Sequence, residues 1–187
     1  LSPPPCLAQQ SLHDADAFEL IANPVWPMPG LRPLLQQAAS SGIFLGVISN
    51  AQFYTPLLFT HFCNASLERL GFTQSLILFS YHFGIAKPSP LLFETVADRL
   101  KTMGISASEV LYLGNDMRND ILPAKTIGFQ TGLFAGDQRS LRLRKENQDC
   151  RNLQPELIVT DLGQLFSMIA ASSGYCSCSA DRGLTLS

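Results

Sequence analysis

The sequence is poor in charge and lacks any long apolar run. Asp, Glu, Lys and Arg make up 15% of the 187 residues, and 15 acidic side chains nearly balance 13 basic ones, for a net charge of −2. Such a balance provides no global attraction for nucleic acid or for an anionic membrane. No apolar run approaches the ~20 residues that span a bilayer. We therefore expect neither nucleic acid nor a membrane as a partner.

The chain also lacks a cysteine framework. Its five cysteines are odd in number, and their spacing suits neither a set of disulfides nor a zinc site. We expect reduced thiols and hence a cytoplasmic protein. The hydrophobic content of 46% is that of a globular chain, and the length suffices for one domain with a sizeable core.

The N-terminus resembles neither a signal peptide nor an intact natural start. Leu1 stands where Met would be expected, and Pro3-Pro4-Pro5 follows at once. We expect that upstream sequence is missing. The predicted organisation is a partial cap segment or linker at 1–28, a core at 29–170 and a disordered tail at 171–187.

Short apolar strands alternate with helices along the core, which predicts an α/β fold with a mainly parallel sheet. The expected strands are Ile43–Ile48, Ser75–Phe79, Val110–Leu113, Phe129–Phe134 and Leu157–Val159. The expected helices are 31–41, 53–70, 89–103, 119–126 and 161–170.

Polar side chains follow three of these strands. Ser49 and Asn50 follow the first, Lys87 lies in the loop beyond the second, and Asp116 follows the third. Ligands of parallel sheets bind outside the carboxyl ends of the strands, so we expect one shared site. Ser49 and Asn50 offer donors for phosphate oxygens, and Lys87 offers a compact positive charge. Taken singly, these are also ordinary turn residues and an ordinary solvated lysine.

Asp116 and Asp120 lie four residues apart at a strand-to-helix junction. Two carboxylates that converge on one small volume repel each other unless they share a cation, and Mg2+ is the usual hard, oxygen-loving choice. The alternative is that Asp116 caps the helix and Asp120 lies in its first turn. Gly114 would give the backbone room to approach a ligand.

In their order, these segments resemble the second, third and fourth motifs of the haloacid-dehalogenase-like hydrolases. The segments are the strand ending in Ser49-Asn50, then Lys87-Pro88, then Gly114-Asn115-Asp116 with Asp120, where an extra Asn separates the usual Gly-Asp pair. The resemblance covers about residues 24–170.

The resemblance implies a Rossmann-like three-layer α/β/α core and part of a helical cap. It also implies Mg2+-dependent phosphatase-like hydrolysis of a small phosphorylated metabolite through an aspartyl-phosphate. By this resemblance Ser49 and Asn50 bind the phosphoryl group. Lys87 is catalytic and stabilises the charge of the phosphoryl group, and Asp116 and Asp120 hold Mg2+.

The nucleophile of that family, an Asp-x-Asp pair after a first, central strand, is not found. Asp14 and Asp16 have the spacing, but 8–12 before them is not a buried strand. We expect the nucleophile upstream and this chain to be inactive. The strands flanking the missing one would have unpaired backbone groups, each costing roughly 1–3 kcal/mol if buried. The chain should then be poorly stable or pair with another segment.

Two other functions stay open. One is a non-catalytic scaffold that binds phosphate or a protein partner, and the other, ranked last, is a phosphoacceptor receiver domain. A basic cluster could contact an anionic leaving group, although we favour a solvated helical face. The cluster comprises Arg139, Arg142, Arg144 and Lys145.

Overall fold

The computed structural model describes residues 26–165 and 167. The expected tail at 171–187 and nearly all of the expected segment at 1–28, Asp14 and Asp16 included, lie outside these described residues. No helix in the described part is long and apolar enough to cross a membrane.

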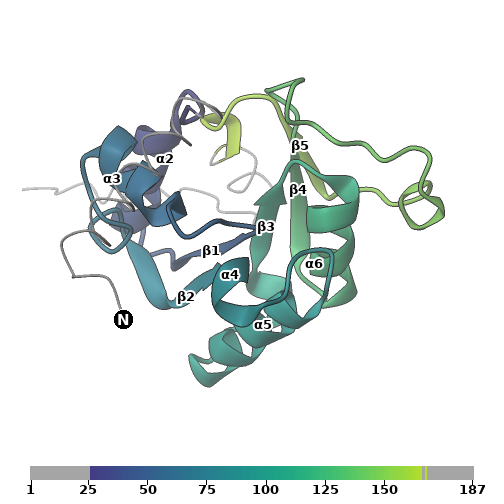
Figure 1. The fold of residues 1–187 in the computed structure, drawn as a ribbon, viewed down its shortest axis with the longest axis horizontal. Coiled ribbons are helices and arrows are strands. Elements are labelled where there is room, and N and C mark those ends of the chain that lie inside the picture. The colour runs from purple at the N-terminus through teal and green to yellow at the C-terminus, as the bar shows by residue number, and fades with distance from the viewer. Residues whose placement is uncertain (1–25, 166, 168–187) are drawn as a thin grey trace, which may run out of the picture.

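All strand pairings in the described part are parallel, as expected for an α/β fold (Figure 1). The strands are β1 (Leu45–Ser49), β2 (Phe72–Phe79), β3 (Leu111–Gly114), β4 (Gln130–Phe134) and β5 (Leu157–Val159). They form two sheets in the orders β1-β2 and β3-β4-β5. Ser49 pairs with Phe79, so the polar residue that ends β1 lies at the same edge as the end of β2.

The division between the sheets falls between β1 and β3. Within the described residues no backbone hydrogen bond joins these two strands, so each has one unpaired edge. All four residues of β3 are only half-buried, and Gly46 in β1 is exposed. A parallel strand inside a sheet covered on both faces would be buried throughout. Among the described residues, the parallel pairing is therefore interrupted at this place.

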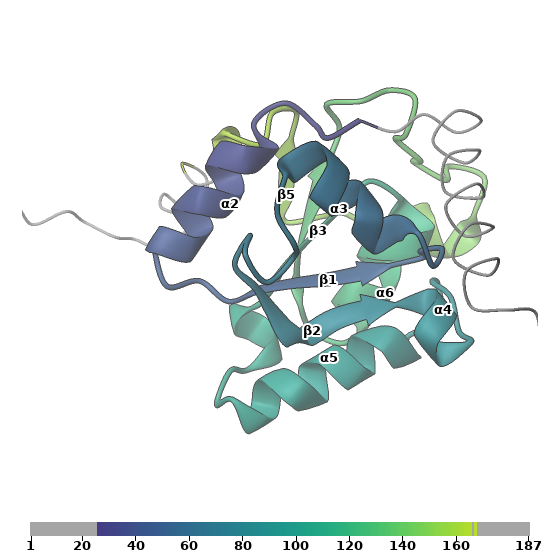
Figure 2. The same cartoon turned by 60° about the vertical axis from the view of Figure 1, so that its left-hand side comes forward.

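Helices cover both faces of the β1–β2 pair. Figure 2 shows α2 (Leu31–Ser40) and α3 (Thr55–Cys63) on one side of this pair and α5 (Leu91–Thr102) on the other. In α2 the buried side chains are Leu35 and Ala38, one helical turn apart, as its apolar spacing predicts.

The main core joins the two sheets through α5. Buried residues of β1, β2 and α5 pack with two residues of the segment around α6 (Leu122–Thr126), and with the half-buried Tyr112 of β3. The buried members are Ile48, Leu76, Leu78, Leu92, Phe93, Val96, Leu100, Ala124 and Phe129. This shared core holds the two sheets together where backbone pairing does not.

Two expected helices differ from the structure. The helix expected at 53–70 spans only Thr55–Cys63, because Asn64 adopts a left-handed conformation that ends it. The helix expected at 119–126 is instead a π-helical turn, Met117–Ile121, followed by α6. Asp116 caps that turn, which explains its earlier start. A short helix not expected from the sequence, α4 (Ser80–Phe83), follows β2.

Glu156 ties the loop before β5 to β4. Lys125 donates to one of its oxygens at 2.7 Å, and Thr131 donates to the other through its backbone N–H at 2.7 Å and its hydroxyl at 2.6 Å. Burial alone would raise the pKa of Glu156, but these hydrogen bonds outweigh it and lower the pKa to about 2. The deprotonated form is thus favoured in the folded state.

We predict that Glu156 makes stability depend on acid pH. A lowered folded-state pKa contributes stability that is present above the unfolded value of 4.5 and is lost as the pH falls toward about 2. Glu156→Gln should cost about 1 kcal/mol at pH 7, because solvent screens a partly exposed pair, and should flatten the stability profile between pH 4.5 and 2. Urea unfolding at several pH values measures this. Glu94→Gln on exposed α5 surface is the control, and an equal effect there would contradict the assignment.

The unpaired edge of β3 predicts uneven hydrogen exchange. β4 pairs on both sides, whereas β3 pairs only with β4. We expect that about half of the β3 amides exchange with little protection, while those of β4 are protected, because exchange follows local hydrogen bonding. Amide exchange followed by NMR checks this, and uniform protection of both strands would show that the β3 edge is covered.

Candidate functional site

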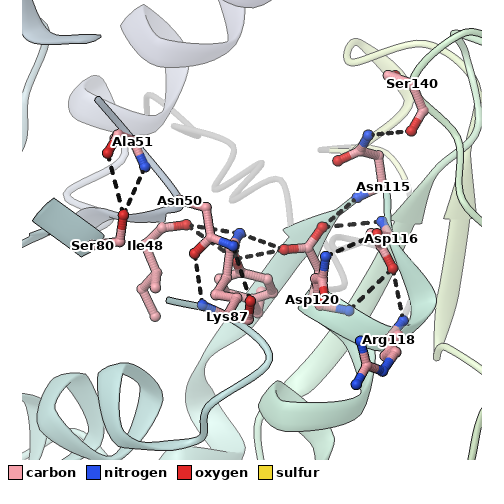
Figure 3. Close-up of polar contacts among 12 residues, drawn as sticks. Ile48, Asn50, Ala51, Ser80, Lys87, Asn115, Asp116, Arg118, Asp120 and Ser140 are labelled. Carbon is pink, nitrogen blue, oxygen red and sulfur yellow. Dashed lines mark hydrogen bonds and ion pairs between the residues drawn. The ribbon is translucent and has the colours of Figure 1, made fainter. Parts of the chain in front are cut away.

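The side chain of Asn50 holds the backbone of Lys87 at the carboxyl ends of β1 and β2. The chain leaves β2 through α4 and a left-handed Gly84, and reaches Lys87 ahead of a cis peptide bond to Pro88. The Asn50 side chain accepts a hydrogen bond from the Lys87 N–H at 2.6 Å and donates to the Lys87 carbonyl at 3.0 Å (Figure 3). The side-chain N–H and oxygen of Asn50 thus both bind the backbone of Lys87 and position it.

The Lys87 ammonium group lies where the two sheets meet. It donates to the Ile48 carbonyl of β1 at 3.2 Å, to the Tyr112 hydroxyl of β3 at 3.2 Å and to Asp120 Oδ1 at 2.5 Å. The side chains of Lys87 and Asp120 are only 12% and 5% exposed, so this is a largely buried ion pair. Both charges are therefore compensated within the described arrangement.

Asp120 is held on both of its oxygens. While Oδ1 contacts Lys87, Oδ2 accepts from the N–H groups of Asn115 and Asp116, each at 3.0 Å. A Cβ on Gly114 would come within 2.6 Å of Asp120 Cγ. Our expectation that Gly114 makes room for a ligand is therefore corrected, because the space above Gly114 is filled by Asp120.

Tyr112 is a member of this network that sequence reasoning missed. Its hydroxyl lies 3.3 Å from the Ile48 carbonyl and 3.2 Å from Asp120 Oδ1, in addition to Lys87. Burial, reinforced by the Asp120 charge, raises the pKa of Tyr112 well above its usual value, so the phenol is neutral. A lone hydroxyl in an otherwise apolar strand was the available signal, since a buried Tyr O–H usually finds a partner.

The Asp116 carboxylate has a different environment from that of Asp120. Its Oδ1 accepts from the N–H groups of Arg118 at 2.9 Å and Asn119 at 3.1 Å, which is the helix-capping arrangement. Arg144 donates to Oδ2 at 2.7 Å. Burial alone would raise the pKa of Asp116, but Arg144 and the capping N–H groups outweigh it and lower the pKa.

Arg144 belongs to a loop that is hydrogen-bonded to the segment directly after β3. Arg142 donates its N–H to the Asn115 carbonyl and accepts from the Met117 N–H, both at 2.9 Å, and Asn115 donates to the Ser140 carbonyl at 2.7 Å. The helical face expected for the basic cluster is therefore wrong: this segment is a loop with turns, and a single parallel bridge joins its Arg142 to Asp116. Backbone hydrogen bonds between residues 25 and 27 positions apart leave no periodic signal in the sequence.

Ser49 ends β1 and is half-buried. Within the described residues its hydroxyl makes no hydrogen bond, whereas the Asn50 amide is bonded to Lys87. The next polar contact along this strand end is Ser80, whose hydroxyl bonds both the N–H and the carbonyl of Ala51 at 3.1 and 3.2 Å (Figure 3).

As arranged, the described residues do not fit a bound Mg2+. Every carboxylate oxygen of Asp116 and Asp120 already accepts at least two hydrogen bonds from the protein, and each acid has a basic partner. The described part contains no group of three Asp, Glu, His or Cys side chains that could hold a metal ion. That Asp116 and Asp120 bind Mg2+ therefore remains a prediction from the sequence.

The fold and the position of these residues define a class: an α/β protein with parallel strands and charged side chains gathered at their carboxyl ends. The sequence profile of the haloacid dehalogenase-like hydrolases matches residues 7–128. The chain belongs to this family.

Relatives of known name support the same grouping. The chain is 27% identical over 145 residues to a ribulose-1,5-bisphosphate 5-phosphatase of Halopiger xanaduensis, covering 76% of this chain and 56% of that protein. The chain thus spans little more than half the length of this curated relative.

Solved structures show the same fold. A haloacid dehalogenase-like protein of unknown function from Agrobacterium tumefaciens matches with a TM-score of 0.63 at 18% identity, over 92% of this chain and 72% of that one. A HAD hydrolase of Bacillus subtilis, solved bound to magnesium, matches with a TM-score of 0.58 at 19% identity, over 76% of this chain and 54% of that one.

We predict that the Tyr112 hydroxyl stabilises the joint between the sheets. Tyr112→Phe removes a hydroxyl that accepts from Lys87 and donates its one hydrogen toward Asp120 and the Ile48 carbonyl, so unfolding should require about 1–3 kcal/mol less. Urea denaturation measures the loss. The matched control is Tyr81→Phe, whose ring is 36% exposed. Similar losses in both variants would show that the Tyr112 hydroxyl has no special role.

Proposed function

We propose that this chain is the core of a phosphatase-like hydrolase that acts on a small phosphorylated metabolite. Family membership and the phosphatase among its relatives support hydrolysis of a phosphate ester. The observation that carries the proposal is the position of Lys87, whose ammonium group lies at the carboxyl ends of the strands in reach of β1 and β3. A compact cation at this place suits a phosphoryl group.

In this proposal Ser49 and Lys87 are the groups that meet the phosphoryl oxygens. The Ser49 hydroxyl has no partner in the described part, and Lys87 can exchange its Ile48 and Tyr112 contacts for phosphate oxygens. Asn50, first expected to bind phosphate through its amide, serves by orienting Lys87. Asp120 stabilises the protonated Lys87 between turnovers.

The nucleophile of the proposed reaction comes from outside the described residues. The unpaired edges of β1 and β3 face each other, and a strand between them would deliver its last residue next to Lys87. An aspartate there would attack phosphorus, as the family resemblance implies: the P–O bond of the ester breaks, the alcohol leaves with a proton from the second aspartate of the pair, and an aspartyl-phosphate forms. Water, deprotonated by that second aspartate, then hydrolyses the aspartyl-phosphate to phosphate and the free carboxylate. The family resemblance implies Mg2+ at Asp116, but in the described arrangement Arg144 occupies that carboxylate.

A non-catalytic scaffold is the second candidate, and a specific observation favours it. The acid in contact with Lys87 is Asp120, whose two oxygens are both engaged by the protein. Such an acid is poorly placed to act as a nucleophile. A chain in this state could bind phosphate or a protein partner without turnover.

We predict that the 187-residue chain does not hydrolyse p-nitrophenyl phosphate with Mg2+ present. An N-terminal extension carrying an apolar strand that ends in Asp-x-Asp should create hydrolysis, because it supplies the strand between β1 and β3 and the nucleophile. The control extension carries Asn-x-Asn and should remain inactive. Steady-state phosphate release measures both.

Two outcomes would contradict this proposal. Turnover by the unextended chain would assign the nucleophile to an acid already present, with Asp14 and Asp16 as the first to replace by Asn. Inactivity of the extended, folded chain across a broad panel of phosphate esters would favour the scaffold instead.

A further inference from the structure

Asp120 has more hydrogen-bond donors than its ion pair alone supplies. Lys87 donates to Oδ1 at 2.5 Å, and the Tyr112 hydroxyl lies 3.2 Å from the same oxygen. Oδ2 accepts from the N–H groups of Asn115 and Asp116, each at 3.0 Å. All of these donors except Lys87 are neutral, and neutral donors stabilise a carboxylate in a buried place. Each oxygen of Asp120 therefore keeps a donor even when Lys87 turns away.

Lys87 has no such reserve. Its ammonium group carries three N–H donors, and each has an acceptor here: the Ile48 carbonyl, the Tyr112 hydroxyl and Asp120 Oδ1. A phosphoryl oxygen is bound only in exchange for one of these acceptors. Asp120 is the costly one to leave, because a buried charge without partners is strongly destabilising. What else can bond Asp120 thus decides how freely Lys87 can serve a ligand.

The Tyr112 hydroxyl is the donor that can be redirected. It carries one hydrogen and lies within reach of two acceptors, Asp120 Oδ1 at 3.2 Å and the Ile48 carbonyl at 3.3 Å. Its ring packs edge-on against Phe93 with centroids 5.0 Å apart, so the core holds the ring while the O–H bond can still rotate. The backbone N–H groups on Oδ2, by contrast, are fixed by the chain. Tyr112 is thus the group that can respond to a movement of Lys87.

We propose that Tyr112 is a positioning residue for Lys87: when the ammonium group turns to a phosphoryl oxygen, the Tyr112 O–H takes over Asp120 Oδ1 and lowers the cost of that movement. The inference rests on the proposed function insofar as Lys87 meets the phosphoryl group. The hydroxyl accepts from Lys87 without a ligand and donates to Asp120 with one. No proton is transferred, because the hydroxyl hydrogen only changes direction.

A double-mutant cycle tests the contact between Tyr112 and Asp120 without any ligand. Lys87→Met removes the cation, and Tyr112→Phe removes one of the neutral donors. We expect Tyr112→Phe to raise the unfolding equilibrium constant about fivefold more in the Lys87→Met background than in wild type, because the hydroxyl is then the remaining donor to Oδ1 among the described residues. Urea unfolding measures all forms. An equal or smaller effect in the Lys87→Met background would mean that Tyr112 serves only as an acceptor for Lys87, and would overturn the inference.

Inorganic phosphate tests the exchange itself. In a chain with isotope-labelled lysine, phosphate should shift the ammonium NMR signal of Lys87, and Lys87→Met should abolish binding. Tyr112→Phe should raise the dissociation constant for phosphate roughly fivefold, because the state in which Lys87 faces the ligand becomes less populated. Tyr81→Phe is the matched control: it removes the same hydroxyl from a ring that is 36% exposed, and should change the dissociation constant by less than about twofold.

The wild-type chain gives a further test that needs no variant to fold. If Tyr112 takes over Asp120, the carboxylate stays in place, so the amides of Asn115 and Asp116 should remain protected from exchange at saturating phosphate. Loss of that protection while the Lys87 signal shifts would show that Asp120 moves with Lys87, and would overturn the inference.

The outcomes separate this inference from the proposed function. Equal phosphate affinity of wild type and Tyr112→Phe, with binding still lost in Lys87→Met, would overturn the role of Tyr112 and leave Lys87 as the phosphate ligand. Tighter binding by Tyr112→Phe would do the same, since it would show that the hydroxyl only competes for Lys87. Absence of phosphate binding to wild type, or binding that survives in Lys87→Met, would overturn both.

Discussion

The contact between the two sheets of this molecule depends on the ammonium group of Lys87. A largely buried cation needs acceptors, and here they come from the backbone of β1, a tyrosine of β3 and an acid after β3. Removal of one partner of such a pair leaves an uncompensated buried charge, which is strongly destabilising. The contacts of Lys87 therefore fix how the strand ends of the two sheets lie against each other.

The charges at the end of β3 are also balanced. Each of its two acids has its own base: Lys87 for Asp120 and Arg144 for Asp116. In the described arrangement neither acid leaves an unbalanced charge at this end of β3.

Much of the fold was predictable because it depends on local patterns. The expected strands Val110–Leu113 and Leu157–Val159 agree with β3 and β5 to within a residue, and β2 begins three residues earlier than expected, at Phe72. Apolar runs and caps carry such information. The edge at which Asn50, Lys87 and Asp120 meet also followed from parallel topology, since carboxyl ends of parallel strands share one side of a sheet. The basic partners of Asp116 and Asp120 could not be predicted from this topology.

The sequence by itself determined the order of elements, the α/β class and the family, because hydrophobic periodicity and short motifs are local properties of the chain. Tertiary structure alone decided that Asn50 clamps Lys87, that Tyr112 joins the network and that Arg144 holds Asp116. These contacts join residues 25 to 37 positions apart, through loops whose paths no repeating pattern specifies. Their geometry arises only when the strand ends, the loop after β4 and the shared core are packed together.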